Sequence, residues 1–120
     1  MQMSVLGTEL TGCCTDPMTG FFRDGTCQTG PADAGQHTVC VELTIEFLEF
    51  LKEHGNDLIT PHPEFDFPGL KPGDSWCVCV ESWLEALQAE IPHRIDLGAT
   101  HHSVIEYCGL ETLRKHSIED

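Results

Sequence analysis

The sequence predicts a small α+β (mixed α/β) single domain over residues 1–120, with a short sheet flanked by helices and two long ordered loops. Three observations predict this fold class. The chain has 120 residues, close to the commonest domain size. Short β-prone runs alternate with segments of helical periodicity. Two stretches, residues 11–37 and 56–75, are rich in turn-forming residues and have no apolar period, which predicts loops.

The first regular elements follow the loop of residues 11–37. Residues 38–43 are β-prone and predict a strand. Thr44 is an N-cap for a helix over residues 45–54, whose apolar side chains recur on one face. Gly55 suits the left-handed position that commonly follows the end of a helix.

The next elements follow the second loop, whose four prolines exclude a helix or a central strand over residues 56–75. Residues 76–80 predict a buried strand. A helix is expected over residues 82–91, and Pro92 ends it.

The last part of the chain is expected to add a strand and short helices. Residues 94–97 predict the strand. Ser103 and Glu106 match a capping box before a short helix through Cys108. Residues 110–116 predict a final helical segment.

The charge of the chain limits its partners. Six Lys and Arg stand against 20 Asp and Glu, giving a net charge of −14. This charge repels phosphate backbones and anionic leaflets, so we expect no nucleic acid and no membrane as partner, and rather a protein or a small ligand. No N-terminal secretory pattern and no apolar run of about 18 residues occurs, which predicts a cytoplasmic protein. Because the cytosol is reducing, thiols or metal ligands are expected rather than disulfides.

The sharpest chemical feature is Cys77-Val78-Cys79. On a strand, alternate side chains share a face, so both sulfurs point the same way and Val78 points the other way. Their Cα atoms would lie about 6.5–7 Å apart, at or beyond the usual limit for a mutual disulfide. Two thiolates on one face can instead share a metal. The alternative is that these cysteines are small buried hydrophobes.

Further soft ligands surround this pair in the sequence. His37 and Cys40 have a His-x-x-Cys spacing. Cys13, Cys14 and Cys27 come from the first loop, and with His101 and His102 they provide enough soft ligands for one tetrahedral site. With zinc or iron as the expected ion, the predicted metal ligands are Cys27, His37, Cys40, Cys77 and Cys79. A site requires three or more Cys or His side chains close together, whereas core cysteines would be scattered among Leu and Phe.

A nucleophilic thiol is the competing interpretation. A cysteine nucleophile needs a nearby base, which His37 could provide for Cys27, or His101 for Cys40. Asp24 or Asp33 would then orient the imidazole. The sequence contains no glycine-rich dinucleotide motif, phosphate loop, serine nucleophile elbow or HExxH zinc motif. For Arg23 and Asp24 we expect a turn-stabilising ion pair.

Several motifs, spread over nearly the whole chain, resemble one bacterial family, domain-of-unknown-function family 2237. They are residues 5–10 (VLGTEL), 15–25 (TDPMTGFFRDG), 37–40 (HTVC), 55–58 (GNDL), 67–74 (FPGLKPGD), 76–79 (WCVC) and 99–101 (ATH). The resemblance implies a single-domain bacterial protein and carries no established activity. It also implies cysteines matching Cys27, Cys40, Cys77 and Cys79, and histidines matching His37 and His101. The family tends to have Arg where this chain has Ser82, which weakens an anion-binding role for that helix start.

These observations support one functional hypothesis and one alternative. The hypothesis is a small cytosolic binding or redox module, in which a cluster of cysteine and histidine holds a transition metal or reactive thiols. Whether it is an enzyme stays open. The alternative is a protein-interaction or scaffold domain whose cysteines fill the core.

Overall fold

A computed structural model describes residues 2–118 of the chain and has an α+β architecture, which confirms the predicted fold class. Its sheet has three antiparallel strands, β1 (His37–Glu42), β2 (Ser75–Cys79) and β3 (Arg94–Ile95). The strand order is β2-β1-β3, so the first strand lies in the middle. The two predicted long loops precede β1 and β2.

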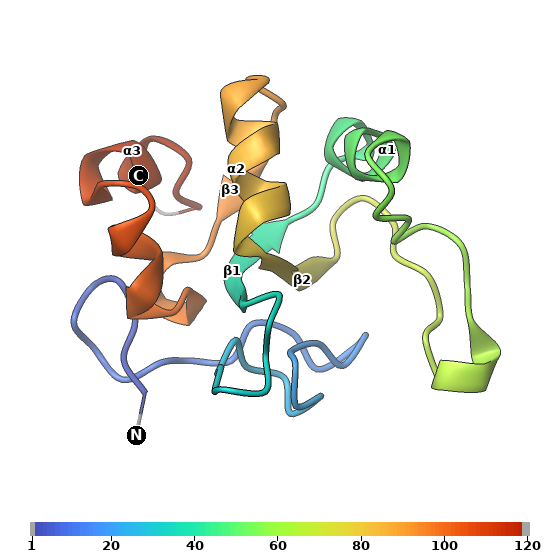
Figure 1. The fold of residues 1–120 in the computed structure, drawn as a ribbon, viewed down its shortest axis with the longest axis horizontal. Coiled ribbons are helices and arrows are strands. Elements are labelled where there is room, and N and C mark those ends of the chain that lie inside the picture. Colours follow the sequence, from blue (N-terminus) through green and yellow to red (C-terminus); the bar gives the residue numbers. More distant parts are fainter. Residues whose placement is uncertain (1, 119–120) are drawn as a thin grey trace.

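Three α-helices lie to one side of the sheet, and the loop that precedes β1 crosses the other side (Figure 1). The helices are α1 (Ile45–Glu53), α2 (Val80–Gln88) and α3 (Leu110–Lys115). Short 3₁₀ turns occur at Pro63–Phe65, Leu97–Ala99 and His102–Glu106. The sheet is therefore enclosed between a helical layer and a layer of irregular chain.

The alternation of side chains along β1 and β2 creates two different interiors. On the helical side, Val39, Val41, Trp76 and Val78 join the main hydrophobic core with Phe47 and Trp83 of the helices. On the loop side, a separate buried cluster consists of Cys27, Cys40, Cys77 and Ala99, with Cys13 packed against it. The predicted alternation is confirmed for Trp76 and Val78, which face the core, and for Cys77, which faces the loop, whereas Cys79 is the N-cap of α2 and is not part of the cysteine cluster.

The loop over the sheet is held in place by buried hydroxyls and a tight turn. The hydroxyl of Thr19 accepts the backbone N–H of Cys77 at 2.8 Å, which covers the outer edge of β2. Gly20 has a φ of +101°, and a Cβ there would lie 2.1 Å from the carbonyl oxygen of Thr26. Only glycine fits this position, so the turn that carries Phe21 to Gly25 depends on it.

Helix α1 forms as the sequence predicts. The Thr44 hydroxyl accepts the N–H of Phe47 at 3.1 Å, and Gly55 has a φ of +88° after the last turn.

Three predictions for the second half need correction. Helix α2 begins at Val80 rather than at Ser82, because Cys79 is its N-cap and the strand passes directly into the helix. The strand predicted over residues 94–97 is limited to Arg94–Ile95. The capping box was wrong: His101 is the N-cap of a 3₁₀ turn, and its Nδ1 accepts the N–H of Ser103 at 3.1 Å.

Within residues 2–118 the structure contains no helix that is long and apolar enough to cross a membrane.

Candidate functional site

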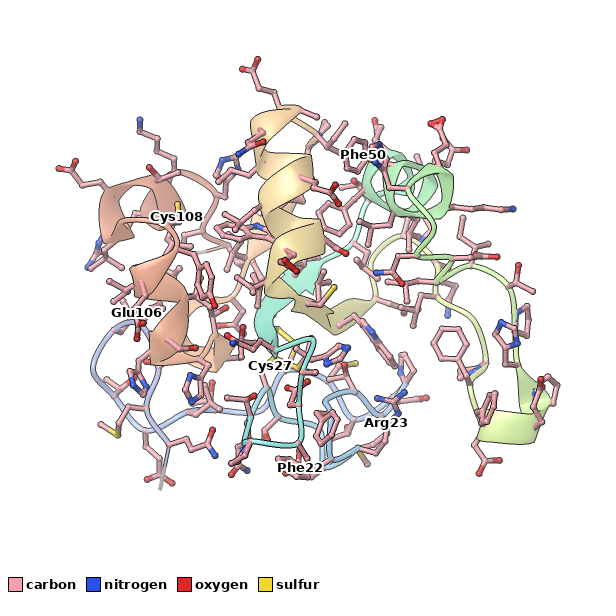
Figure 2. The ribbon with its side chains drawn as sticks, viewed as in Figure 1. Phe22, Arg23, Cys27, Phe50, Glu106 and Cys108 are labelled. Carbon is pink, nitrogen blue, oxygen red and sulfur yellow. A yellow bond between two sulfur atoms is a disulfide. The ribbon has the colours of Figure 1, made fainter. Side chains whose placement is uncertain are left out.

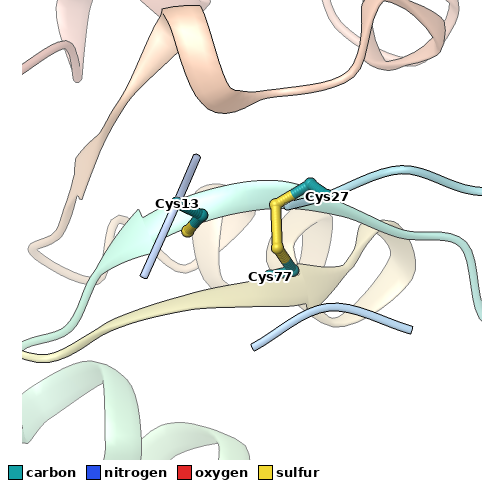
Figure 3. A group of neighbouring side chains, drawn as sticks. All are labelled: Cys13, Cys27 and Cys77. Carbon is teal, nitrogen blue, oxygen red and sulfur yellow. A yellow bond between two sulfur atoms is a disulfide. The ribbon is translucent and has the colours of Figure 1, made fainter. Parts of the chain in front are cut away.

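Four cysteines form two neighbouring disulfides beneath the sheet. Cys40 and Cys77 are directly opposite on β1 and β2, and both face the loop. The loop brings Cys13 to Cys40 and Cys27 to Cys77, and each pair forms a disulfide. The sulfur atoms of Cys13, Cys27 and Cys77 all lie within 4.8 Å of one another (Figure 3).

This arrangement corrects the expectation that the cysteines remain thiols. Two disulfides take up Cys13, Cys27, Cys40 and Cys77, and Cys14, Cys79 and Cys108 are free. The expectation of free thiols rested on the reducing cytosol alone. The cellular compartment does not determine which cysteine side chains meet in the fold. As predicted, Cys77 and Cys79 do not pair with each other.

Cys79 is a partly exposed thiol at the junction of β2 and α2. Its S–H donates to the hydroxyl of Ser82 at 2.9 Å. The side-chain amide of Asn56 lies 4.0 Å from the sulfur and 3.4 Å from the same hydroxyl. Cys79 is thus held by polar side chains at the junction of strand and helix and does not belong to the main hydrophobic core.

A β-bulge places His37 opposite Cys79. Cys40 pairs with Cys77, and Val39 with Val78, but the register shifts between His37 and Val39. In unbroken register Thr38 would face Cys79, whereas the extra residue makes His37 its partner. The two residues therefore sit across from each other at one end of the sheet.

A buried carboxylate orients the ring of His37. Asp33 Oδ1 lies 2.7 Å from His37 Nδ1, and Oδ2 accepts the His37 backbone N–H and the Thr29 hydroxyl, each at 2.9 Å. Because a carboxylate only accepts, Nδ1 carries the proton, and Nε2 of the neutral ring is left as a base. Gly35 makes room for the ring, since a Cβ there would lie 3.0 Å from Cε1.

The hydrogen bonds that Asp33 accepts from His37 and Thr29 control the pKa of its carboxyl. Burial by itself would raise the pKa of this carboxyl. The backbone N–H and ring of His37 and the Thr29 hydroxyl outweigh burial and lower the pKa of Asp33 below its usual range. The side chain is fully buried, whereas that of His37 is 39% exposed. A buried Asp33 carboxylate is thus in contact with the partly exposed His37 imidazole.

His37 and Cys79 line a groove of about 270 Å³ at the outer edge of β2. Its wall is largely aromatic and apolar, and its polar groups are a guanidinium, two imidazoles, an amide and a thiol. The lining residues are Arg23, His37, Asn56, Leu58, His62, Phe65, Phe67, Trp76, Cys77, Val78 and Cys79. Within residues 2–118, no Asp or Glu lines this groove.

Arg23 belongs to this groove instead of forming the expected ion pair with Asp24. Its guanidinium lies 5.2 Å from the centre of the Trp76 ring and donates to the carbonyl of Gly20 at 2.6 Å. Asp24 accepts from Thr26 and Gln28 within its own turn. Figure 2 shows Arg23 at the edge of the loop layer, on the side of the β2 groove.

The structure divides the predicted ligand set between two adjacent sites. Cys27, Cys40 and Cys77 are together in the sulfur cluster, whereas His37 and Cys79 line the groove beside it. Coordination of a metal by all five stays a prediction. Two partners outside that set are Cys13, which completes the cluster, and Asp33, which holds His37.

Asn56 and Ser82 were not recognised from the sequence. Asn56 follows the end of α1 and Ser82 lies in the first turn of α2, so their meeting at Cys79 depends on how the two helices pack. No local pattern signals this contact.

One family profile, described as "Uncharacterized protein conserved in bacteria (DUF2237)", matches residues 3–117. No curated protein matches the chain.

Proposed function

Since the chain belongs to the DUF2237 family of uncharacterised bacterial proteins, we propose its function from the groove alone: a binding module with a redox-active thiol. Cys79 is the nucleophile, His37 is its base, and Asp33 orients the imidazole. The observation that carries the proposal is the backbone pairing of His37 with Cys79 across the bulge, together with the contact of Asp33 with His37 Nδ1.

The roles follow from ordinary thiol chemistry. A thiol attacks as its thiolate, and an imidazole within reach takes the proton. The Asp33 carboxylate holds the tautomer in which Nε2 is free and stabilises the imidazolium that forms. This division of roles is the one that a Cys-His-Asp arrangement performs in thiol catalysis.

The groove indicates the ligand. The guanidinium of Arg23 attracts an anion. The rings of Phe67 and Trp76 provide an apolar wall. The ligand class that fits is a small anionic disulfide with an apolar or aromatic part.

The reaction with such a ligand is thiol–disulfide exchange. The Cys79 proton passes to His37, and the thiolate attacks one sulfur of the ligand. A Cys79–ligand disulfide forms, the ligand S–S bond breaks, and the leaving thiolate takes the proton back.

The test measures each free thiol of the native chain separately. The protein is mixed at pH 7 with the anionic aromatic disulfide of nitrothiobenzoate or with neutral dipyridyl disulfide, and labelled cysteines are quantified by peptide mass spectrometry. Cys14 and Cys108 are internal controls. Cys79 is expected to react first, and faster with the anionic probe.

Variants separate the roles. His37→Gln should slow Cys79 by about 10-fold or more, a conservative figure for loss of a general base. Arg23→Gln should remove the preference for the anionic probe. His54→Gln, at an exposed histidine outside the groove, should change nothing. Equal rates at the three thiols, or equal slowing of all three by His37→Gln, would refute the proposal.

A further inference from the structure

The sulfur cluster is a second site, distinct from the groove, and its chemistry depends on its redox state. Four cysteines gather on the loop side of the sheet, with Cys40 and Cys77 at facing positions of β1 and β2 and Cys13 and Cys27 from the loop. We infer that in its reduced form the chain binds one Zn²⁺ through Cys13, Cys27, Cys40 and Cys77.

Three of the four sulfurs are already spaced as a tetrahedral ion requires, and the fourth, of Cys40, is bonded to Cys13. Zn–S bonds of about 2.3 Å place the ligand sulfurs of a tetrahedron about 3.8 Å apart. The sulfurs of Cys13, Cys27 and Cys77 already lie within 4.8 Å of one another. The Cα atoms of the bonded pairs are 5.8 Å and 5.4 Å apart, so reduction frees each pair to open without moving the backbone far.

The surroundings favour a soft cation. Among the described residues, the buried members of the cluster are Cys27, Cys40, Cys77 and Ala99, with Cys13 packed against them. Thiolates select zinc and similar soft ions over magnesium or calcium, which require oxygen ligands. The requirement that a site have clustered sulfurs, rather than sulfurs scattered through the core, is therefore met here.

The backbone around the ligands is already held. The N–H of Cys40 donates to the Thr100 hydroxyl at 3.1 Å, and that of Cys77 to the Thr19 hydroxyl at 2.8 Å. Both hydroxyls are buried and lie outside the disulfides. These contacts survive reduction, so β1 and β2 continue to present two ligands in fixed positions.

The conversion of the two disulfides into a zinc site is a balanced reaction when a dithiol is the reductant. Two dithiols reduce the two disulfides to four thiols and become two cyclic disulfides themselves. The four thiol protons pass to solvent when Zn²⁺ binds. Oxidation by a disulfide or peroxide reverses the change and releases the ion, so the cluster is a redox-controlled zinc site.

The inferred ligands differ from those predicted by the sequence in one respect. Cys13 replaces His37 and Cys79, which line the groove beside the cluster. The spacing of cysteines along the sequence does not reveal that the loop folds Cys13 onto β1.

The experiment is metal binding to the full chain, reduced and kept anaerobic. Co²⁺ is titrated first, because tetrahedral thiolate coordination gives a sulfur-to-metal charge-transfer band and intense visible d–d bands. Zn²⁺ should then displace Co²⁺ at one equivalent per chain. With Zn²⁺ bound, alkylation and peptide mass spectrometry should find Cys13, Cys27, Cys40 and Cys77 protected, and Cys14, Cys79 and Cys108 labelled.

Two matched variants guard against misfolding as the explanation. Cys13→Ala should lose the Co²⁺ spectrum, whereas Cys14→Ala, one residue along the same loop, should keep it. A second readout uses the wild type: a mild oxidant should release Zn²⁺ and restore the Cys13–Cys40 and Cys27–Cys77 disulfides.

Three outcomes would overturn the inference. One is that all seven thiols alkylate at the same rate with and without Zn²⁺. Another is labelling of Cys13 with Zn²⁺ bound. The third is a Co²⁺ spectrum that survives Cys13→Ala. The Co²⁺ spectrum and the protection of Cys13 do not depend on the reactivity of Cys79, so this inference and the proposed function can fail separately.

Discussion

Removing one disulfide at a time should destabilise the chain by an amount set by the length of the loop it closes. The Cys27–Cys77 bond spans 50 residues and the Cys13–Cys40 bond spans 27. A cross-link restricts the unfolded chain, and the loss of loop entropy gives about 4.1 kcal/mol for the longer loop and about 3.6 kcal/mol for the shorter at 25 °C. Each is a large part of the 5–15 kcal/mol typical of a domain.

The assay is urea unfolding of Cys27→Ala/Cys77→Ala and Cys13→Ala/Cys40→Ala, followed by tryptophan fluorescence and far-ultraviolet circular dichroism. A chelator is present throughout, so that metal bound to remaining thiols does not mask the loss. Because the unfolded chain becomes less restricted, the dependence of unfolding free energy on urea should steepen as well. The loops overlap in sequence, so the quadruple variant should lose less than the sum.

The comparison of the two variants is the sharper part of the test. Their difference should be about 0.5 kcal/mol, with the longer loop losing more. Cys14→Ala and Cys108→Ala are the controls, because neither residue is in a disulfide. A loss below about 1 kcal/mol for Cys27→Ala/Cys77→Ala, or an equal loss in the controls, would refute the reasoning that these bonds restrict the unfolded chain.

Two further predictions concern the helical layer. His93 accepts the Trp83 indole N–H at 3.0 Å and donates from Nδ1 to the Ile91 carbonyl at 2.8 Å. Burial, together with the nearby His116, lowers the pKa of His93 below its ordinary 6.5. The unfolded chain therefore takes up this proton first, so the free energy of unfolding should fall as pH drops below about 6.5, and His93→Gln should flatten this dependence in urea titrations across pH. Thr44→Ala should cost about 1 kcal/mol of unfolding free energy, because the Thr44 hydroxyl caps α1 and donates to the Pro92 carbonyl, whereas Thr44→Ser should stay near wild type; equal stability of both would contradict this role.

The sequence was sufficient where local periodicity and capping decide the structure. The Thr44 cap, the Gly55 end of α1 and the alternation from Trp76 to Val78 along β2 are all short-range features, and each forms as predicted. The start of α2 lies earlier than predicted, because residues 76–80 were all assigned to the strand. The helix instead begins at Val80, whose N–H donates to the Gln36 carbonyl across the sheet.

The parts that could not be predicted depend on how the long first loop folds. That loop brings Cys13 to Cys40, Cys27 to Cys77 and Arg23 over Trp76, all contacts between residues far apart in sequence. Asp33 and His37 are only four residues apart, but the turn between them needs a positive φ at Gln36, which no helix or strand pattern signals.

The bulge at the start of β1 is what separates the two sites while keeping them on the same strands. Cys40 and Cys77 pair in regular register and face the cluster. Two residues further along β2, Cys79 belongs to the groove, and the extra residue in β1 gives it His37 as partner instead of Thr38. Cys77 also lines the groove, so the strand residue that bonds to Cys27 in the cluster contributes to the wall beside Cys79.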